Sequence, residues 1–336
     1  MGINISTIIP KREIFLDDLK NKKLAVDASQ MLYQFLSSIR QQDGTPLMDS
    51  NENITSHLMG ISTRIPNLME KGLKLAFVFD GSSPLLKIHE KEQREHKKQL
   101  AEEKLEKAKE EGDEKLMMRY SKQSIRLSKE IIGETKELVQ ALGLPIIQAP
   151  SEAEAQCAFL NEKDDVEFTC SSDFDSLLYG APRLVRNLTA STRKRLPSGA
   201  YVSINPELIE LKNVLENLGI NQDQLIILAI LIGTDYNEGI SKVGPKTALK
   251  LVKQYKDFDE LFKEVKAEFN WKQVYATFKN MPIIKNYQLK WKTPDIEKIK
   301  EILVERHDFN EERVNKNLER ITKVKNKSNE ILNKWF

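Results

Sequence analysis

The sequence predicts an α/β fold in which a mostly parallel central sheet is flanked by helices. Short apolar segments alternate with amphipathic segments through the first half of the chain, a pattern typical of a parallel sheet with helices on its faces. From residue 87 to about residue 142 this alternation is interrupted by a stretch rich in Glu, Lys, Arg and Gln that contains no Pro. After Pro206 the chain becomes helical again. These observations predict a sheet in the first half, an inserted helical segment and a helical second half.

The strands are predicted from short apolar runs. The candidates are residues 24–26, 75–79, 145–147, 166–170 and 183–188. The charged insertion that follows the second strand has too few apolar residues in its first part to be a core helix. It is either a solvated helical pair or a functional arch, and the sequence leaves both interpretations open. Within it, Lys122, Arg126 and Lys129 fall at helical spacing and predict one basic stripe, whereas residues 324–328 are interpreted as a short basic linker.

Composition excludes several classes of protein without identifying one. The 336 residues contain 52 Lys and Arg and 50 Asp and Glu, so the two signs are mixed and net charge alone does not indicate nucleic-acid binding. Cys157 and Cys170 have no metal-ligand spacing, which fits a reducing compartment. The longest purely apolar run is residues 225–232, too short to cross a membrane. We expect a cytoplasmic protein that does not bind membranes and is monomeric on its own.

Carboxylates follow the predicted strand ends and the apolar run at 225–232. They are Asp27, Asp80, the pair Asp173 and Asp175, and Asp235. In an open α/β sheet, ligands bind beyond the carboxyl ends of the strands, so acids from several strands would meet there. A single acid in such a place is more often a helix N-cap, but five together predict a shared site.

Two closely spaced pairs of acids add to this set. On an extended strand end, the i, i+2 spacing of Asp173 and Asp175 would place both carboxylates on one face about 7 Å apart. Glu152 and Glu154 open a helix that Ser151 could cap, and acids are favoured in a first helical turn by the helix dipole. The structural interpretation of this second pair is therefore strong.

So many acids in one crevice require a bound cation. The four His and two Cys show no zinc-like spacing, and oxygen ligands favour Mg²⁺, with Mn²⁺ as an alternative. Two such ions about 4 Å apart would activate a water and bind a scissile phosphate. Phosphodiester hydrolysis is the reaction that this arrangement predicts.

A helix-hairpin-helix is predicted around residues 239–248. Gly244 would allow close approach of a phosphate, the following helix N-terminus would donate N–H groups, and Lys246 would add charge. The alternative is an ordinary turn, because Gly-Pro-Lys also suits a plain helix start. Lys87 and Arg94 are seven residues apart and can face one direction at the base of the charged insertion.

These motifs together resemble the flap endonuclease family, most closely its archaeal members. The segments that carry the resemblance are Val26-Asp27-Ala28-Ser29, Val78-Phe79-Asp80-Gly81, Ala149-Pro150-Ser151-Glu152-Ala153-Glu154-Ala155, Gly233-Thr234-Asp235-Tyr236 and Gly244-Pro245-Lys246. The resemblance runs from Gly2 to the last residue. It implies a 5′ flap endonuclease with 5′–3′ exonuclease activity on branched DNA, acting in Okazaki-fragment maturation and long-patch base excision repair at the nucleoid.

The resemblance also implies roles for individual residues. One metal group would be Asp27, Asp80, Glu152 and Glu154, and the second Asp173, Asp175 and Asp235. Lys87 and Arg94 would contact the scissile phosphate and act in catalysis. DNA contacts would come from Gly2, Tyr33, Arg40, Arg64, Glu152, Gly233, Asp235, Gly244 and Lys246, and Tyr33 would stack on a base. The N-terminal pattern Gly2 to Ser6 also matches a myristoylation signal, an interpretation that a Gly2 amine near the active site disfavours.

The implied organisation has five parts. They are an N-terminal nuclease region (1–98), a charged arch linker (99–115), an internal nuclease region (116–258) with the helix-hairpin-helix at 236–250, C-terminal helices (259–323) and a tail (324–336). In the tail, Asn329, Leu332, Trp335 and Phe336 have the spacing of a sliding-clamp-binding peptide, although Asn replaces the usual Gln. Two terminal aromatic residues are suited to anchoring a partner.

The sequence departs from the family at Lys242. The family usually has a glycine at this place in the hairpin, so the departure bears on the turn geometry and on any monovalent cation bound by its backbone carbonyls. Two other functions remain as alternatives. One is a scaffold that binds branched DNA without cutting it, and the other is a phosphatase that forms an aspartyl intermediate at Asp27, which has no use for the hairpin or for seven acids.

Overall fold

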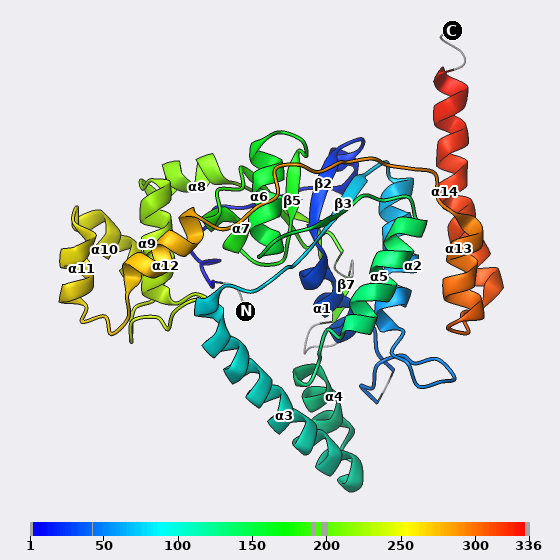
Figure 1. The fold of residues 1–336 in the computed structure, drawn as a ribbon, viewed down its shortest axis with the longest axis horizontal. Coiled ribbons are helices and arrows are strands. Elements are labelled where there is room, and N and C mark those ends of the chain that lie inside the picture. The colour runs from blue at the N-terminus through cyan, green and yellow to red at the C-terminus, as the bar shows by residue number, and fades with distance from the viewer. Residues whose placement is uncertain (1–2, 42, 190–192, 196–200, 333–336) are drawn as a thin grey trace.

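A seven-stranded, mostly parallel sheet lies at the centre of the protein, and helices cover it (Figure 1). The computed structural model describes residues 3–41, 43–189, 193–195 and 201–332. The strand order is β1-β9-β6-β5-β2-β3-β4. The parallel strands are β2 (Lys23–Asp27), β3 (Lys74–Phe79), β4 (Ile146–Gln148), β5 (Phe168–Cys170) and β6 (Arg183–Arg186). All five predicted strands are therefore confirmed.

Two antiparallel strands extend one edge of this sheet and were not predicted. They are β9 (Glu207–Glu210) beside β6 and the two-residue β1 (Arg12–Glu13) beside β9. A separate hairpin joins β7 (Arg193–Arg195) and β8 (Tyr201–Ser203). These strands are too short and too rich in charged residues to give a period-two apolar pattern.

Alternate residues of the central strands face two different helical layers. Val26 and Phe77 pack with α1 (Ala28–Ser38), α2 (Ser56–Glu70) and α5 (Lys129–Ala141), whereas Ala25 and Val78 pack against α6 (Ala153–Glu162) on the other face. This alternation follows from the two-residue period of a strand. Burial on both faces explains why the strands read as continuous apolar runs.

A second core surrounds the predicted apolar run, which forms α9 (Gln222–Ile232). Around it lie α7 (Asp175–Leu178), α8 (Leu211–Leu218), α10 (Pro245–Gln254), α11 (Phe258–Glu264) and α12 (Trp271–Lys279). Among the described residues no single helix is long and apolar enough to cross a membrane. The pair α8 and α9 passes that test together but is bent by 79°, and residues 225–231 of α9 are buried in this core.

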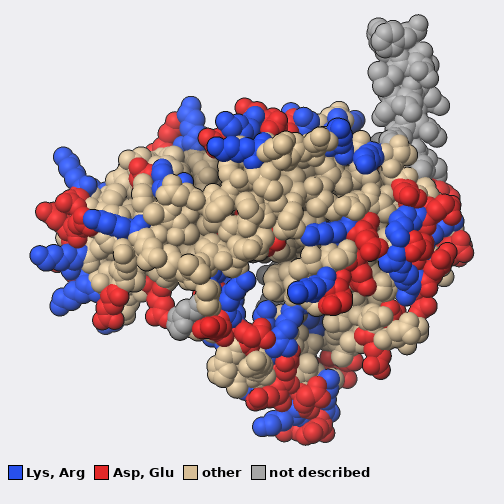
Figure 2. Space-filling view, in the orientation of Figure 1, with Lys and Arg blue, Asp and Glu red and all other residues tan. Residues whose placement is uncertain are grey.

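The charged insertion forms a helical pair that projects from the body (Figure 1). A short helical turn, η2 (Leu85–Lys87), leads into α3 (Ile88–Glu111), and α4 (Glu114–Gln123) returns after a turn at Gly112, whose φ is +68°. Acidic and basic side chains are interspersed over this projection, which we call the arch (Figure 2). The predicted basic stripe is wrong. Lys122 lies in α4 and Lys129 begins α5, but Arg126 lies in the non-helical segment between them, where it pairs with Glu95 and Glu102 of α3.

The C-terminal segment packs on α2 and α5. It consists of α13 (Ile296–Lys300), a π-helical turn η3 (Glu301–Glu305) and α14 (Glu311–Leu332). The predicted linker at 324–328 is wrong, because α14 continues through it and contains no Pro or Gly that would end a helix.

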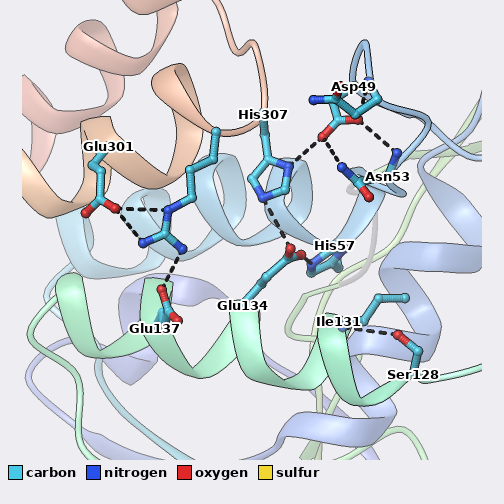
Figure 3. A network of polar contacts seen from close by, with 11 residues as sticks. Asp49, Asn53, His57, Ser128, Ile131, Glu134, Glu137, Glu301 and His307 are labelled. Atoms are coloured by element: carbon cyan, nitrogen blue, oxygen red, sulfur yellow. Dashed lines mark hydrogen bonds and ion pairs between the residues drawn. The ribbon is translucent and has the colours of Figure 1, made fainter.

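Just after η3, His307 donates from Nδ1 to Asp49 (2.8 Å), and its Nε2 lies 3.3 Å from Glu134 of α5 (Figure 3). Glu134 also accepts from His57 of α2 at 3.1 Å. Side chains from four separate parts of the chain therefore meet in one network.

Candidate active site

The first two carboxylates cap helices at the carboxyl ends of neighbouring strands. Asp27 ends β2 and accepts the Gln30 N–H at 3.0 Å, which makes it the N-cap of α1. Asp80 follows β3 and accepts the Ala153 N–H at 2.7 Å, at the start of α6. Asp27 therefore caps a helix and also lies among the other acids.

Glu152 and Glu154 lie at the start of α6, as predicted, but Ser151 is not its cap. The N-cap is Glu152, and the Ser151 hydroxyl instead donates to the Ser82 carbonyl at 2.9 Å. The N–H of Ala153, in the first turn of α6, instead donates to Asp80, which follows β3. Glu154 accepts from the Ser171 hydroxyl at 3.2 Å, which links α6 to the end of β5.

Asp173 and Asp175 lie on a turn rather than on an extended strand end. Strand β5 ends at Cys170, and Phe174 between the two acids is buried with helical dihedral angles (φ −89°, ψ −4°). The predicted extended geometry is therefore wrong, because a helix, α7, begins at Asp175. Asp175 is buried and accepts the Ile3 N–H at 2.8 Å.

The seventh acid, Asp235, is brought to the same site by the turn after α9. Gly233 ends that helix with φ +112°, a conformation that favours glycine. Asp235 lies 3.2 Å from the Lys87 ammonium and 2.6 Å from the Arg94 guanidinium. Lys87 also lies 2.5 Å from Glu152. Both cations at the arch base therefore face the acids, as their spacing predicts.

The carboxylates are close enough to change one another's ionisation. Burial, followed by repulsion from Asp80, raises the pKa of Asp27 well above its usual range. Burial and then Asp175 do the same to the pKa of Glu154. The pKa of Asp175 rises to about 7, chiefly through burial and with a further contribution from Asp173. Acids from four strand ends and one helix end thus form a single electrostatic cluster.

Lys87 and Arg94 neutralise the part of the cluster that contains Glu152 and Asp235. Burial alone would raise the pKa of Asp235, but Lys87 and Arg94 reverse that effect and lower it. For Glu152, burial outweighs the opposing effect of Lys87, and its pKa is raised. Lys87 and Arg94 therefore neutralise part of the negative charge of the cluster, and the raised pKa values of the other acids favour proton binding there.

The donor set of the cluster fits hard divalent cations. Its ligands are carboxylate oxygens alone, the chemistry that Mg²⁺ and Mn²⁺ prefer. Among the described residues, no three acidic, His or Cys side chains already surround a common point as metal ligands. The Lys87 ammonium lies between Glu152 and Asp235, so cation binding there requires Lys87 to move.

Two of the predicted DNA-binding residues lie on α1 and α2, the helices that pack against Val26 and Phe77. Tyr33 is 38% exposed, and the Lys98 ammonium of the arch lies 5.5 Å from the centre of its ring. Arg64 donates to the Thr189 carbonyl and lies over the ring of Phe35. Of these, Tyr33 is open to a stacking base.

Arg40 has a different environment, because it holds the arch. Its guanidinium donates to the carbonyls of Leu36 (2.8 Å) and Gly44 (2.7 Å) and to both the carbonyl (3.1 Å) and the hydroxyl of Ser121 in α4. This part of the guanidinium is engaged within the protein. Its predicted role in DNA binding stays a prediction.

The predicted helix-hairpin-helix falls on α9, the turn at residues 233–244 and α10, and its assignment as a DNA-binding motif stays a prediction. Gly244 is the N-cap of α10, and a Cβ there would meet no atom within 4 Å, so its surroundings are open to a ligand. Lys246 is exposed in the first turn. Lys242 has φ +64°, a conformation in which glycine is favoured, and this explains physically why a glycine suits that position.

The remaining predicted residues lie near the two chain ends. Gly2, Trp335 and Phe336 lie outside the described residues, and only the backbone of Asn329 and Leu332 is described, within α14. The residue next to Gly2, Ile3, is buried, and its N–H bonds to Asp175.

Several residues that shape the site were missed. Gln30 donates from its side chain to Asp173, Ser171 contacts Glu154, and Arg186 donates to the Ser172 carbonyl at 2.8 Å. The only sequence signal was for Gln30, which stands three residues after an N-cap acid, the spacing of a capping box. The others contact residues on different elements and have no local pattern.

Comparisons with known proteins agree with this architecture. The family model described as the XPG N-terminal domain matches residues 3–101, and that of the XPG I-region matches residues 143–235. The flap endonuclease 1 of Staphylothermus marinus is 46% identical over 100% of both chains. That of Pyrococcus abyssi is also 46% identical, over 100% of this chain and 98% of the relative.

Solved structures share the fold. Flap endonuclease-1 from Methanococcus jannaschii is 38% identical and superimposes with a TM-score of 0.77 over 96% of this chain and 98% of that one. The catalytic core of Rad2 in complex with a DNA substrate gives a TM-score of 0.68 at 24% identity, over 96% of this chain and 100% of that one, which is a likeness of fold.

Proposed function

Since the chain belongs to the flap endonuclease family, we propose that its clustered carboxylates hold two Mg²⁺ ions and that Lys87 and Arg94 bind the scissile phosphate. The protein is a structure-specific, divalent-metal-dependent nuclease that hydrolyses phosphodiester bonds of DNA flaps. The observation that carries the residue assignment is geometric. Lys87 contacts both Glu152 and Asp235, Arg94 contacts Asp235, and Gln30 contacts both Asp27 and Asp173, so acids from separate elements lie side by side.

The proposed ligands fall into two neighbouring groups. One consists of Asp27, Asp80, Glu152 and Glu154, and the other of Asp173, Asp175 and Asp235. When bound, a pair of Mg²⁺ ions, or of Mn²⁺ ions, activates the attacking water and neutralises charge on the leaving oxygen. The residues of this chain supply no nucleophile of their own. Their part is to position charge and to release bound protons as cations enter.

Lys87 and Arg94 have two sets of partners available to them. In the cluster they neutralise Glu152 and Asp235. A scissile phosphate brings its own negative charge to the same place, and it can accept from the Arg94 guanidinium in the two-pronged manner typical of arginine. The ammonium of Lys87 is a compact charge that can follow the phosphate by rotation of its side chain. We propose that both cations exchange carboxylates for phosphate during the reaction.

The path of the DNA follows the arch and the hairpin. A cavity of about 620 Å³ at the arch base is lined by basic residues of α3 and by residues 233–235. A single strand passing there would meet Arg94 and Lys98, with Tyr33 beside Lys98 for stacking. The duplex behind the flap would place a phosphate at Gly244 and the N-terminus of α10, a contact that does not depend on base sequence. Carbonyls of the hairpin turn would hold a monovalent cation.

Cleavage of a flap substrate tests the site assignment. Purified protein should cut a 5′-flap DNA in Mg²⁺, and Asp175→Asn should lower the rate by at least about 100-fold while DNA affinity measured in Ca²⁺ changes little. The matched control is Asp164→Asn. Asp164 is an exposed acid outside the cluster, so this variant should cut the flap at the normal rate. Tight flap binding by the unaltered protein without any cleavage would instead favour a scaffold.

The biological setting is proposed from the family and the tail. We propose 5′–3′ exonuclease activity as well, and action at the nucleoid during Okazaki-fragment maturation and long-patch base excision repair. Asn329, Leu332, Trp335 and Phe336 would dock on a sliding clamp. Removing residues 332–336 should leave cutting by the isolated protein unchanged and abolish stimulation by the clamp. Equal stimulation of both forms would show that the tail is not the contact.

A further inference from the structure

Gln30 connects the two groups of carboxylates. It is the third residue of α1, and its backbone N–H donates to Asp27 at 3.0 Å. Its side-chain amide donates from Nε2 to Oδ2 of Asp173, on the turn after β5. One residue thus contacts an acid of each proposed metal group from two different atoms.

The side chain of Gln30 does not make the capping-box contact that its position in the helix suggests. In a capping box, a Gln three residues after the N-cap reaches back to the N-cap backbone. The Gln30 side chain instead crosses from α1 to the β5 turn, 143 residues further along the chain. A cavity of only about 10 Å³ remains between these elements, so the contact is close and admits little water.

We infer that Gln30 is a positioning residue that orients Asp173 for the metal ions. Asp173 lies on the turn between β5 and α7, where its backbone N–H bonds to the Ser171 hydroxyl at 3.2 Å and its carboxylate accepts from the Gln30 amide. A carboxylate has about four acceptor sites, so one bond from an amide leaves the others for a cation. Neutral donors of this kind orient metal ligands without competing for them.

The amide is suited to this place because it carries no charge. A Lys or Arg at position 30 would compete with the cations for the acids, as Lys87 does for Glu152. A carboxylate would add negative charge beside Asp27, whose pKa is already raised by burial and then by repulsion from Asp80. The Gln30 amide stabilises one orientation of the Asp173 carboxylate and leaves the net charge of the site unchanged.

This inference rests on the proposed metal site, and calorimetric titration of Mg²⁺ into the full chain without DNA tests it. Gln30→Met keeps the size of the side chain and the backbone bond to Asp27 but removes the amide donor. We expect its Mg²⁺ affinity to fall by about tenfold or more, the usual cost of removing an outer partner of a metal ligand. The matched control is Gln34→Met, one turn further along α1, where the side chain accepts from the Thr189 hydroxyl at 2.6 Å. Its affinity should equal that of the unaltered chain.

A double-mutant cycle separates positioning from a general effect on folding. With Asp173→Ala in place, the amide has lost its acceptor, so adding Gln30→Met should cause no further loss of affinity. The rise of the melting temperature on adding Mg²⁺, measured against each variant's own value in chelator, provides a second readout even if a variant is less stable. Equal affinity of Gln30→Met and the unaltered chain, or additive losses in the cycle, would overturn the inference. Absence of Mg²⁺ binding by the unaltered chain would instead overturn the metal site itself.

Discussion

At the scale of single residues, Asp175 shows how burial prepares a carboxyl group for cation binding. Its pKa of about 7, raised by burial and then by Asp173, lies well above the usual value of about 4 for an unfolded chain. The folded state therefore binds a proton more tightly than the unfolded state does. For such a group the stabilising contribution is full below about pH 4 and is lost as the pH rises through about 7.

This linkage predicts how pH affects stability and metal binding. In chelator, the free energy of unfolding should fall as the pH rises from about 5 to about 8, and saturating Mg²⁺ should reduce that fall. Mg²⁺ affinity should rise over the same interval, because cations displace protons from the acids. Denaturant unfolding at several pH values, with and without Mg²⁺, checks both expectations. Asp175→Asn should weaken the pH dependence in chelator, and an unchanged profile would contradict the assignment.

Lys242 has a left-handed backbone conformation that favours glycine over other residues. A non-glycine residue at φ +64° costs on the order of 1 kcal/mol, so Lys242→Gly should raise the free energy of unfolding by about that amount. If the ammonium also meets a phosphate, the same change lowers the slope of DNA affinity against salt by about one. Lys242→Asn separates the two effects, because Asn tolerates this conformation but carries no charge. It should share the altered salt slope and gain less stability.

At the scale of secondary-structure elements, the arch depends on contacts of unequal strength. Helix α3 is polar on every side, so little apolar burial holds it in place. Arg126 joins it to the segment after α4 through exposed ion pairs with Glu95 and Glu102, which contribute little in water. Arg40 is half-buried and bonds α4 to the end of α1. Arg40 is therefore the stronger attachment.

Arg40→Gln should loosen α4 more than Arg126→Gln does. Removing the guanidinium leaves the carbonyls of Leu36, Gly44 and Ser121 without their partner, at a cost of about 2 kcal/mol. Amide hydrogen exchange should become faster in α4 while the central strands keep their protection. Arg126→Gln is the matched control, and its α4 amides should exchange more slowly than those of Arg40→Gln. Equal exchange in the two variants would mean that Arg40 does not hold the arch.

At the scale of the whole molecule, the sequence predicted the features that repeat locally. The five parallel strands have short apolar centres and α9 contains a continuous apolar run, and the acids at their ends could be placed because the ends of parallel strands share an edge. Contacts between distant segments have no such signal. Gln30 and Asp173 are 143 residues apart, and the Asp173–Asp175 turn depends on a helix start that the i, i+2 spacing cannot show. The strand β9 was missed because its alternation is too short to detect.

The His307 network is another long-range feature, and it makes the C-terminal segment part of the main fold. Asp49 is fully covered by its neighbours, and hydrogen bonds from Asn53 and His307 outweigh its burial and hold its pKa at about 2. The carboxylate therefore remains charged. His307 lies between this acid and Glu134, so its ring nitrogens join the loop before α2 to α5 (Figure 3).

Removing that imidazole should weaken the attachment of the C-terminal helices and the stability of the whole chain together. His307→Leu leaves the charge of Asp49 covered and without one of its donors, at a cost of about 3 kcal/mol. Denaturant unfolding followed by both fluorescence and circular dichroism should show one transition at lower denaturant, since α13 and α14 pack directly on α2 and α5. The control is Arg306→Gln, whose exposed pairs with Glu137 and Glu301 should contribute much less. Two separate transitions in His307→Leu would mean that the C-terminal segment folds independently of the sheet.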